Sequence, residues 1–335
     1  MQKTIPIVHC FDNNFVIPAA VAFYSMLEYS NKGTKYILYV LHTDITARNQ
    51  EKLQETISDF NNAEIVFVNM ENKFEDVFNQ LKIKNHFSKE VIYKILTPSL
   101  FPQYDKLIIS DVDVVYLANF EQQFFDFNTE HNDNYLAGFR GPAFKKESAI
   151  NKFLSVYKND FNNEEIEKLN SGVGGGFLIC NLKKMRKDNI EEKFLECLTQ
   201  NTNRLIQLEQ DVINLVCYPQ IEILRKNTLV CTYLYDLYKA DEILFEDNYT
   251  EQDLKYVLDN PVQLHYAGGL KPWKNPSCTK SEHWYYYLLK TPFFYEQMDK
   301  LESALLSAKQ NFASLPLKRK IKLTLNHIAK KILSR

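Results

Sequence analysis

The sequence contains little glycine: only 9 of its 335 residues, against an average of about 7%. Eight of the nine fall in three short groups, at positions 138 and 141, between 172 and 176, and at 268 and 269. Glycine permits backbone conformations with positive φ and very close approach of other groups. The three groups are therefore candidate walls of a binding site, with ordinary turns as the alternative interpretation.

Long apolar runs and paired cysteines are also missing. No stretch of about 18 apolar residues is present, and the first seven residues reach strand-like sequence too early for a signal peptide. The six cysteines are scattered and form no C-x-x-C pair, which favours reduced, buried thiols over a zinc site. These features predict a cytoplasmic protein.

Acidic residues are absent from positions 303–335, which hold eight of the 40 Lys and Arg residues. The rest of the chain has 32 basic against 42 acidic residues, a net charge of about −10. That sign argues against a nucleic-acid partner. From about residue 316 an amphipathic basic helix is predicted, with its apolar face at Leu317, Ile321, Leu325, Ile328 and Ile332. It could dock on an anionic membrane surface, peripherally on the inner face of the cell membrane, or pack on the acidic body.

What is present is an alternation of strand and helix patterns, with 45% hydrophobic residues to form a core. Strand signals at 5–11, 36–41 and 63–68 alternate with helical signals at 16–29 and 46–60. Later segments continue the pattern: a helix at 88–96 ending near Pro98, strands at 106–110, 177–182 and 262–266, and helices at 190–198 and around 210–215. This order predicts an α/β fold with a mostly parallel central sheet flanked by helices. We expect one domain over residues 1–275 and a helical extension over 276–335.

Two carboxylates follow the predicted strand at 106–110. Asp111 and Asp113 are separated by one residue, so in an extended chain both side chains project to the same side. Two hard oxygen ligands suit Mn²⁺ or Mg²⁺, which would neutralise a diphosphate at the end of the strand. The alternative is a pair of solvated loop carboxylates.

A histidine closes another predicted strand. His265 is followed by Gly268 and Gly269 and then by Lys271. This order supplies an imidazole ligand, a backbone that permits close approach, and a cation for a phosphate. A core histidine with an ordinary hydrogen bond is the alternative interpretation.

Five segments in order carry a resemblance that spans most of residues 5–274. They read IVHCFDNNF from Ile7, DKLIISDVD from Asp105, GFLICNL from Gly176, EQDVIN from Glu209 and HYAGGLKPW from His265. Together they resemble the family 8 glycosyltransferases, a retaining group with the GT-A (Rossmann-like) fold that includes bacterial lipopolysaccharide galactosyl- and glucosyltransferases. The resemblance implies transfer of a hexose, galactose or glucose, from a UDP-sugar to a glycan or glycolipid acceptor such as lipopolysaccharide, capsule or another surface glycan.

The resemblance also assigns residues. Asp111, Asp113 and His265 would hold Mn²⁺ or Mg²⁺, and the catalytic region would contain Gln210, Glu209 and Lys94. Phe15 would stack near the uracil. The full set implied to bind the nucleotide sugar is Cys10, Phe11, Asp12, Asn14, Phe15, Asp111, Val112, Asp113, Gly174, Gly175, Gly268 and Lys271.

Three positions depart from the family pattern. Lys94 stands where the family usually has an arginine, and it keeps the charge without the planar fork. Gly174-Gly175-Gly176 stands where Asn-Ala-Gly or Asn-Ser-Gly is usual, although Asn170-Ser171-Gly172 matches those letters four residues earlier. The position at which the family has an acidic residue that contacts the sugar falls near Arg140 and Gly141 in this chain. The register of the glycine segment and the identity of the sugar stay open.

The implied mechanism is departure of UDP, stabilised by the metal and Lys271, with front-face attack by the acceptor and the leaving phosphate as base. The Gln210 amide is neutral and hence a poor nucleophile. One alternative is an inactive UDP-sugar-binding protein. A sugar nucleotidyltransferase is disfavoured because no Gly-rich basic loop follows the first strand, and an NAD dehydrogenase because no G-x-G-x-x-G does. An aromatic group, Trp273, Trp284, Tyr285 and Tyr286, is either a sugar platform or internal packing.

Overall fold

The computed structural model describes residues 3–71, 73–74, 89–148, 151–152, 155 and 160–314. The chain divides into two compact units, Met1–Pro292 and Phe293–Arg335. In the second unit the described residues form helix α15 (Phe294–Ser314). The amphipathic basic helix expected from about residue 316 lies outside the described residues.

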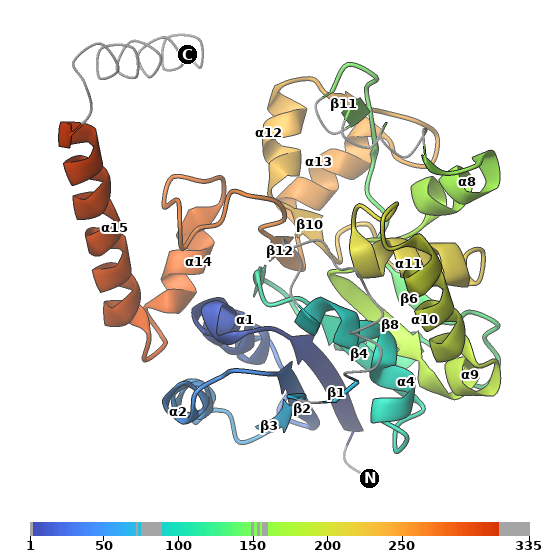
Figure 1. Cartoon of the computed structure of the whole chain (residues 1–335), viewed down its shortest axis with the longest axis horizontal. Helices are drawn as coiled ribbons and strands as arrows, with labels where there is room; N and C mark the ends of the chain where they lie inside the picture. The colour runs from blue at the N-terminus through green and yellow to red at the C-terminus, as the bar shows by residue number, and fades with distance from the viewer. Residues whose placement is uncertain are drawn as a thin grey trace. The chain divides into compact units, whose positions relative to one another are not determined.

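A seven-stranded sheet forms the centre of the first unit (Figure 1). Its strands, in spatial order, are β3 (Ala63–Asn69), β2 (Thr34–His42), β1 (Lys3–Cys10), β4 (Lys106–Ser110), β8 (Phe177–Asn181), β6 (Leu136–Gly138) and β9 (Ile221–Ile223). Only β8 runs against its neighbours; all other adjacent pairs are parallel. The predicted α/β fold with a mostly parallel sheet is confirmed.

Two smaller sheets extend the first unit. One has the order β10 (Val230–Cys231), β12 (Gln263–His265) and β5 (Val114–Tyr116), and the other pairs β11 (Ile243–Leu244) with β7 (Ala143–Phe144). In the first of these, His265 pairs directly with Val114. That pairing brings the end of β12 to the segment that follows β4.

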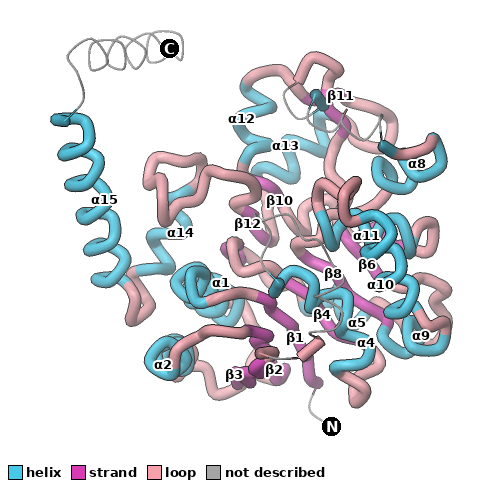
Figure 2. The backbone as a smooth tube through the Cα atoms, viewed as in Figure 1, coloured by secondary structure: helices cyan, strands magenta, loops and turns pink. Residues whose placement is uncertain are grey.

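Helices cover both faces of the central sheet (Figure 2). The helices after the first strand are η1 (Asn13–Phe15), α1 (Val16–Glu28), α2 (Ala47–Thr56), η2 (Lys89–Leu96), α4 (Thr97–Leu100) and α5 (Glu121–Asp126). The later ones are α8 (Asn163–Ser171), α9 (Leu182–Lys187), α10 (Ile190–Asn201), α11 (Leu208–Cys217), α12 (Tyr233–Lys239), α13 (Glu251–Asp259) and α14 (Ser281–Leu288). Helix α1 packs with α2 and α14, whereas η2, α9, α10 and α11 pack together on the other side.

Successive side chains of β1 point to opposite faces of the central sheet, and helices bury both sets. Val8 joins the core that contains Ile92 and Val212, from η2 and α11. His9, the next residue, faces the opposite side and lies 4.8 Å, centroid to centroid, from the Phe23 ring of α1. A central strand buried on both faces is typical of a parallel sheet.

The alternation predicted for residues 5–68 agrees with β1, α1, β2, α2 and β3. The helix predicted over residues 88–96 agrees with η2 in its bounds, but Pro98 does not end the helical region. Residues 89–96 form the 3-10 helix η2, and α4 then begins at Thr97 with Pro98 in its first turn. Proline is tolerated there because the first-turn N–H groups have no partner within the helix.

A buried carboxylate joins α5 to β2. The Glu121 carboxylate accepts hydrogen bonds from Asn31 N and Nδ2 at 2.7 Å each, from Thr34 Oγ1 at 2.8 Å and from Tyr36 OH at 2.7 Å. Burial alone would raise the pKa of Glu121, but these donors lower it. The carboxylate therefore stabilises the fold in its charged form.

We expect Glu121→Gln to reduce the free energy of unfolding by about 3 kcal/mol, because an amide cannot accept all four bonds. Since the pKa of Glu121 is lower in the folded chain, the difference between wild type and variant should be fully present above pH 4.5 and shrink as the pH falls. Urea unfolding at several pH values measures it. Glu51→Gln, on an exposed face of α2, is the matched control; equal stability of all three proteins would contradict the assignment.

Within the described residues, no helix combines the length and apolar character that crossing a membrane requires.

Candidate active site

The pairing of the strands brings four segments together: the ends of β1, β4 and β12 and the start of β8. Parallel β1 and β4 end there, and antiparallel β8 starts there, because Ser110 pairs with Phe177. Two backbone hydrogen bonds fix the segment after β4: Asp111 N donates to Gly176 O, and Tyr266 N donates to Asp113 O, both at 2.9 Å. The carboxylates thus lie between the glycine segment and the end of β12.

Asp111, Asp113 and His265 lie together where these segments meet. Their candidate ligand atoms are all within 4.8 Å of one another. His265 Nε2 is 3.1 Å from Asp113 Oδ1 and 3.6 Å from Asp111 Oδ2. Residues separated by more than 150 positions in the sequence are therefore gathered as one set of ligands.

The chemistry of this set fits a divalent cation. Burial alone would lower the pKa of His265, but Asp113 raises it to about 10, so the site strongly favours positive charge. A Cβ atom at Gly176 would lie 3.0 Å from His265 Cε1 and 3.2 Å from Asp111 Oδ2, closer than about nine in ten real Cβ contacts. Glycine at 176 leaves room for the cluster.

Two lysines neutralise the cluster. Lys94, only 5% exposed, donates from Nζ to Asp111 Oδ1 at 2.6 Å and to Glu209 Oε1 at 2.9 Å. Lys271 donates to Asp113 and to the backbone oxygen of Tyr266. Lys94 thereby links η2 to β4 and α11, while Lys271 contacts the cluster from the segment after β12.

The glycine segment forms the wall between the cluster and α11. Gly174 N donates to Phe139 O, and Gly175 N donates to Gln210 Oε1 at 2.8 Å. Because β8 begins at Phe177, residues 174–176 directly precede the strand, whereas Asn170 and Ser171 end α8. Gly174, Gly175 and Gly176 therefore occupy the position directly before the strand.

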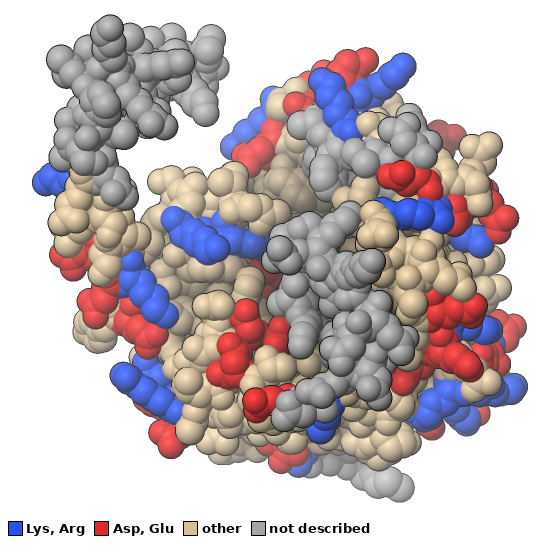
Figure 3. Space-filling model, in the orientation of Figure 1, with Lys and Arg blue, Asp and Glu red and all other residues tan. Residues whose placement is uncertain are grey.

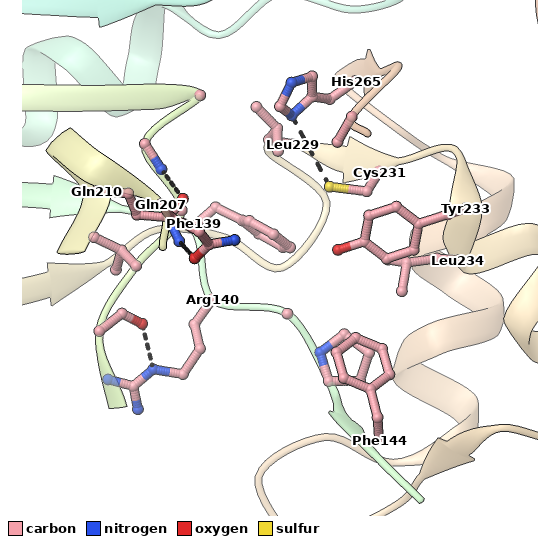
Figure 4. A pocket seen from close by; sticks show the side chains of 18 of the residues that line it. Phe139, Arg140, Phe144, Gln207, Gln210, Leu229, Cys231, Tyr233, Leu234 and His265 are labelled. Carbon is pink, nitrogen blue, oxygen red and sulfur yellow. Dashed lines mark hydrogen bonds between the residues drawn. The ribbon is translucent and has the colours of Figure 1, made fainter. Parts of the chain in front are cut away.

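A cavity of about 700 Å³ opens beside this wall. Figure 4 shows Gln210, Phe139 and Arg140 on one side, facing Cys231, Tyr233 and Leu234 on the other. His265 and Phe144 lie at opposite ends of the view. The candidate metal ligand therefore borders a space large enough for a small ligand.

The predicted nucleotide-binding residues that follow β1 differ in burial and in contacts. Asp12 accepts from Asn14 N at 2.9 Å and caps η1. The Phe15 ring is 5.8 Å, centroid to centroid, from that of Trp273, and Cys10 is partly buried. Phe11, 3% exposed, has its side chain in the core.

Val112 is likewise buried, so for it, as for Phe11, only the backbone is available to a ligand. Gly268 borders the cavity at φ +79°, a conformation that glycine adopts without strain. In the aromatic group Trp284 is fully buried and 5.9 Å from Trp273, while Tyr286 is 53% exposed. Trp284 belongs to internal packing.

Two residues near the site received no role from sequence. Asn214 Oδ1 accepts from Val173 N at 2.9 Å, and its Nδ2 donates to Val173 O at 3.0 Å, so it fixes the glycine segment. Its spacing of four from Gln210 on a helix was a usable signal. Cys231 Sγ lies 4.0 Å from His265 Nδ1; only the strand pairing of β10 with β12 reveals it.

Lys and Arg are interspersed with Asp and Glu over the face of the molecule that Figure 3 presents. That face is not the uniformly basic surface that binding to phosphate backbones requires.

Comparisons with known proteins identify the family and the fold of this chain. Lipopolysaccharide 1,2-glucosyltransferase of Escherichia coli is 23% identical over 277 residues, which are 81% of this chain and 74% of that protein. The structure of the galactosyltransferase LgtC with donor and acceptor sugar analogues has a TM-score of 0.63 at 19% identity and covers 86% of this chain and 96% of that one. The bifunctional glycosyltransferase WbbM gives a TM-score of 0.69 at 20% identity over 89% of this chain.

This chain spans about half, 52%, of the WbbM chain. At these identities the two solved structures establish the fold alone, which is that of the GT-A glycosyltransferases. The family model described as Glycosyl transferase family 8 matches residues 6–276. The chain therefore belongs to glycosyl transferase family 8.

Proposed function

We propose that this chain is a retaining hexosyltransferase that moves galactose or glucose from a UDP-sugar to a glycan acceptor. One observation carries the proposal: His265, which forms the cluster with Asp111 and Asp113, lines a cavity that Gln210 and the glycine segment also border. A cation-binding cluster beside a pocket for a sugar is what the departure of a nucleoside diphosphate requires.

The charges of the cluster support an anionic ligand. Asp111, Asp113 and Glu209 carry three negative charges, and Lys94 and Lys271 carry two positive ones. With His265 as a neutral ligand, a divalent cation would turn this set net positive. Two carboxylates with one imidazole favour Mn²⁺, with Mg²⁺ as the second candidate. Bound there, the cation would act as a Lewis acid toward the diphosphate.

The chain's own residues would then bind and orient the donor. Lys271 Nζ, at the cluster and partly exposed, supplies a positive charge for the departing UDP. Gln210 has its Oε1 held by Gly175 N and its Nε2 donated to Gln207 Oε1 at 2.5 Å. A neutral amide held in this way positions a sugar and is a poor nucleophile, so we propose front-face attack with the leaving phosphate as base.

Glu209 has a different role in this proposal. Burial raises its pKa, and the ammonium of Lys94, 2.9 Å away, acts in the opposite direction. Because the carboxylate is engaged by Lys94, we assign Glu209 and Lys94 to holding Asp111 in place beside the donor sugar. They are positioning residues.

We further propose an acceptor in lipopolysaccharide, capsule or another surface glycan. The support is the name of the E. coli relative, together with the basic composition of residues 303–335. A cytoplasmic enzyme that docks peripherally on the inner face of the membrane would meet such acceptors.

A panel of UDP-sugars with Mn²⁺, followed by UDP release, tests the function. We expect release from UDP-galactose or UDP-glucose and a loss of about 100-fold or more after chelation of the metal, because the charge of the leaving group is then uncompensated. Restoring Mn²⁺ should restore the rate. UDP binding without release from any UDP-sugar, in the presence of acceptor mixtures, would identify an inactive binding protein instead.

A further inference from the structure

The cavity beside the cluster has an uneven charge. Among its described lining residues, Arg140 is the one side chain with a permanent charge, and none is Asp, Glu or Lys. The other polar lining residues are His265 of the cluster, five amides and a tyrosine: Asn151, Asn170, Gln207, Gln210, Asn214 and Tyr233. This is unexpected in a chain whose body, without residues 303–335, carries about −10.

Arg140 is half-buried and lacks a counter-ion among the described residues. Its Nε donates to Gly172 O at 3.3 Å, which is the side-chain hydrogen bond that the structure gives it. Burial lowers the pKa of Arg140. The group that acts to raise this pKa is Tyr218 and not a carboxylate. Its Nη groups are therefore left to bind a ligand.

The glycine segment orders the cavity. Gly176 touches the metal cluster, Gly175 is bonded to Gln210, and Gly172 is bonded to Arg140. Gly172 and Gly176 are four residues apart, so the two ends can be separated by up to about 13 Å. Figure 4 shows the Arg140 guanidinium and His265 on opposite sides of the view. Arg140 thus lies at the far end of the glycine segment from the cluster, and we place the donor sugar between them, beside Gln210.

We propose that Arg140 binds a carboxylate or phosphate group on the acceptor glycan and so selects acidic acceptors. This rests on the proposed hexosyl transfer. A guanidinium offers two parallel N–H donors that match a carboxylate or a phosphate. A partly desolvated, unpaired positive charge gains more binding energy from an anion than from a neutral hydroxyl. Neutral hydroxyls are already suited by the amide side chains that line the cavity.

Direct binding tests the inference without turnover. Octyl glucoside, octyl glucuronide and glucose 6-phosphate are titrated into the full chain with Mg²⁺ and UDP, and binding is followed by saturation-transfer NMR. We expect the two anionic probes to bind about 10-fold to 100-fold more tightly than octyl glucoside. Arg140→Ala should abolish that preference, and Arg140→Lys should retain part of it. Arg48→Ala, an exposed arginine on α2, is the control and should keep it.

The outcomes separate this inference from the proposed function. If anionic and neutral probes bind equally, or if Arg140→Ala keeps the preference, the inference is wrong, whether or not UDP is released from UDP-sugars. If UDP-glucuronate is turned over in preference to UDP-glucose and Arg140→Ala reverses this, the anion belongs to the donor, which overturns the assignment to the acceptor.

Discussion

Replacing Asp113 with alanine should lower UDP release from the preferred UDP-sugar about 1,000-fold, corresponding to the loss of roughly 4 kcal/mol of transition-state stabilisation. Asp113 is the residue on which the cluster converges, since it contacts both His265 Nε2 and Lys271 Nζ. Its removal takes away one metal ligand and the counter-ion of Lys271. Asp113 lies 13% exposed, so water replaces it poorly.

Initial rates of UDP release at saturating Mn²⁺ provide the measurement. Asp59→Ala, which removes an exposed carboxylate after α2, is the matched control and should leave the rate unchanged. Thermal unfolding of both variants shows whether the chain stays folded. A rate for Asp113→Ala within a few-fold of wild type, in folded protein, would remove the basis for metal-assisted departure of UDP.

Replacing Lys94 with methionine is expected to impair both activity and stability. Lys94 has its ammonium between Asp111 and Glu209 and is 5% exposed. Burial alone would lower its pKa, but the two carboxylates raise it, so the side chain stays charged. Without it two carboxylates share a buried site, at a cost of about 3 kcal/mol or more. Displacement of Asp111 should reduce UDP release about 100-fold.

Two further variants separate charge from position. Lys94→Arg keeps the charge and should retain most of the stability. Lys94→Met combined with Glu209→Gln removes one charge of each sign, so its free energy of unfolding should recover toward wild type while its activity stays low. Urea unfolding and UDP release are measured on all three. If the double variant is as unstable as Lys94→Met alone, the instability of Lys94→Met does not come from repulsion between Asp111 and Glu209.

The first half of the sheet could be predicted because its residues carry local signals. Apolar runs such as 36–41 and 63–68 alternate with helical spacing, and short connections make consecutive elements neighbours. The reversed direction of β8 could not be read in this way. Its sequence, FLICN, is a buried strand in either direction, and only its pairing with β4 and β6 decides.

The candidate site, too, could be predicted from the sequence only in part. Asp111 and Asp113 were predicted from their spacing after a buried strand, and His265 from its position at a strand end. Their meeting depends on the pairing of His265 with Val114, which no local pattern encodes. The link from Lys94 to both Asp111 and Glu209 joins three distant segments. Such contacts depend on tertiary structure, so sequence could name the residues and not their partners.

Binding of Mn²⁺ in the presence of UDP, followed by electron paramagnetic resonance, examines most directly whether Asp111, Asp113 and His265 form one cation site. The wild-type chain should bind one Mn²⁺ tightly. His265→Ala, which removes the imidazole and leaves both carboxylates, should weaken binding about 10-fold to 100-fold. Equal affinity and stoichiometry in the two folded proteins would place the cation elsewhere and contradict this site.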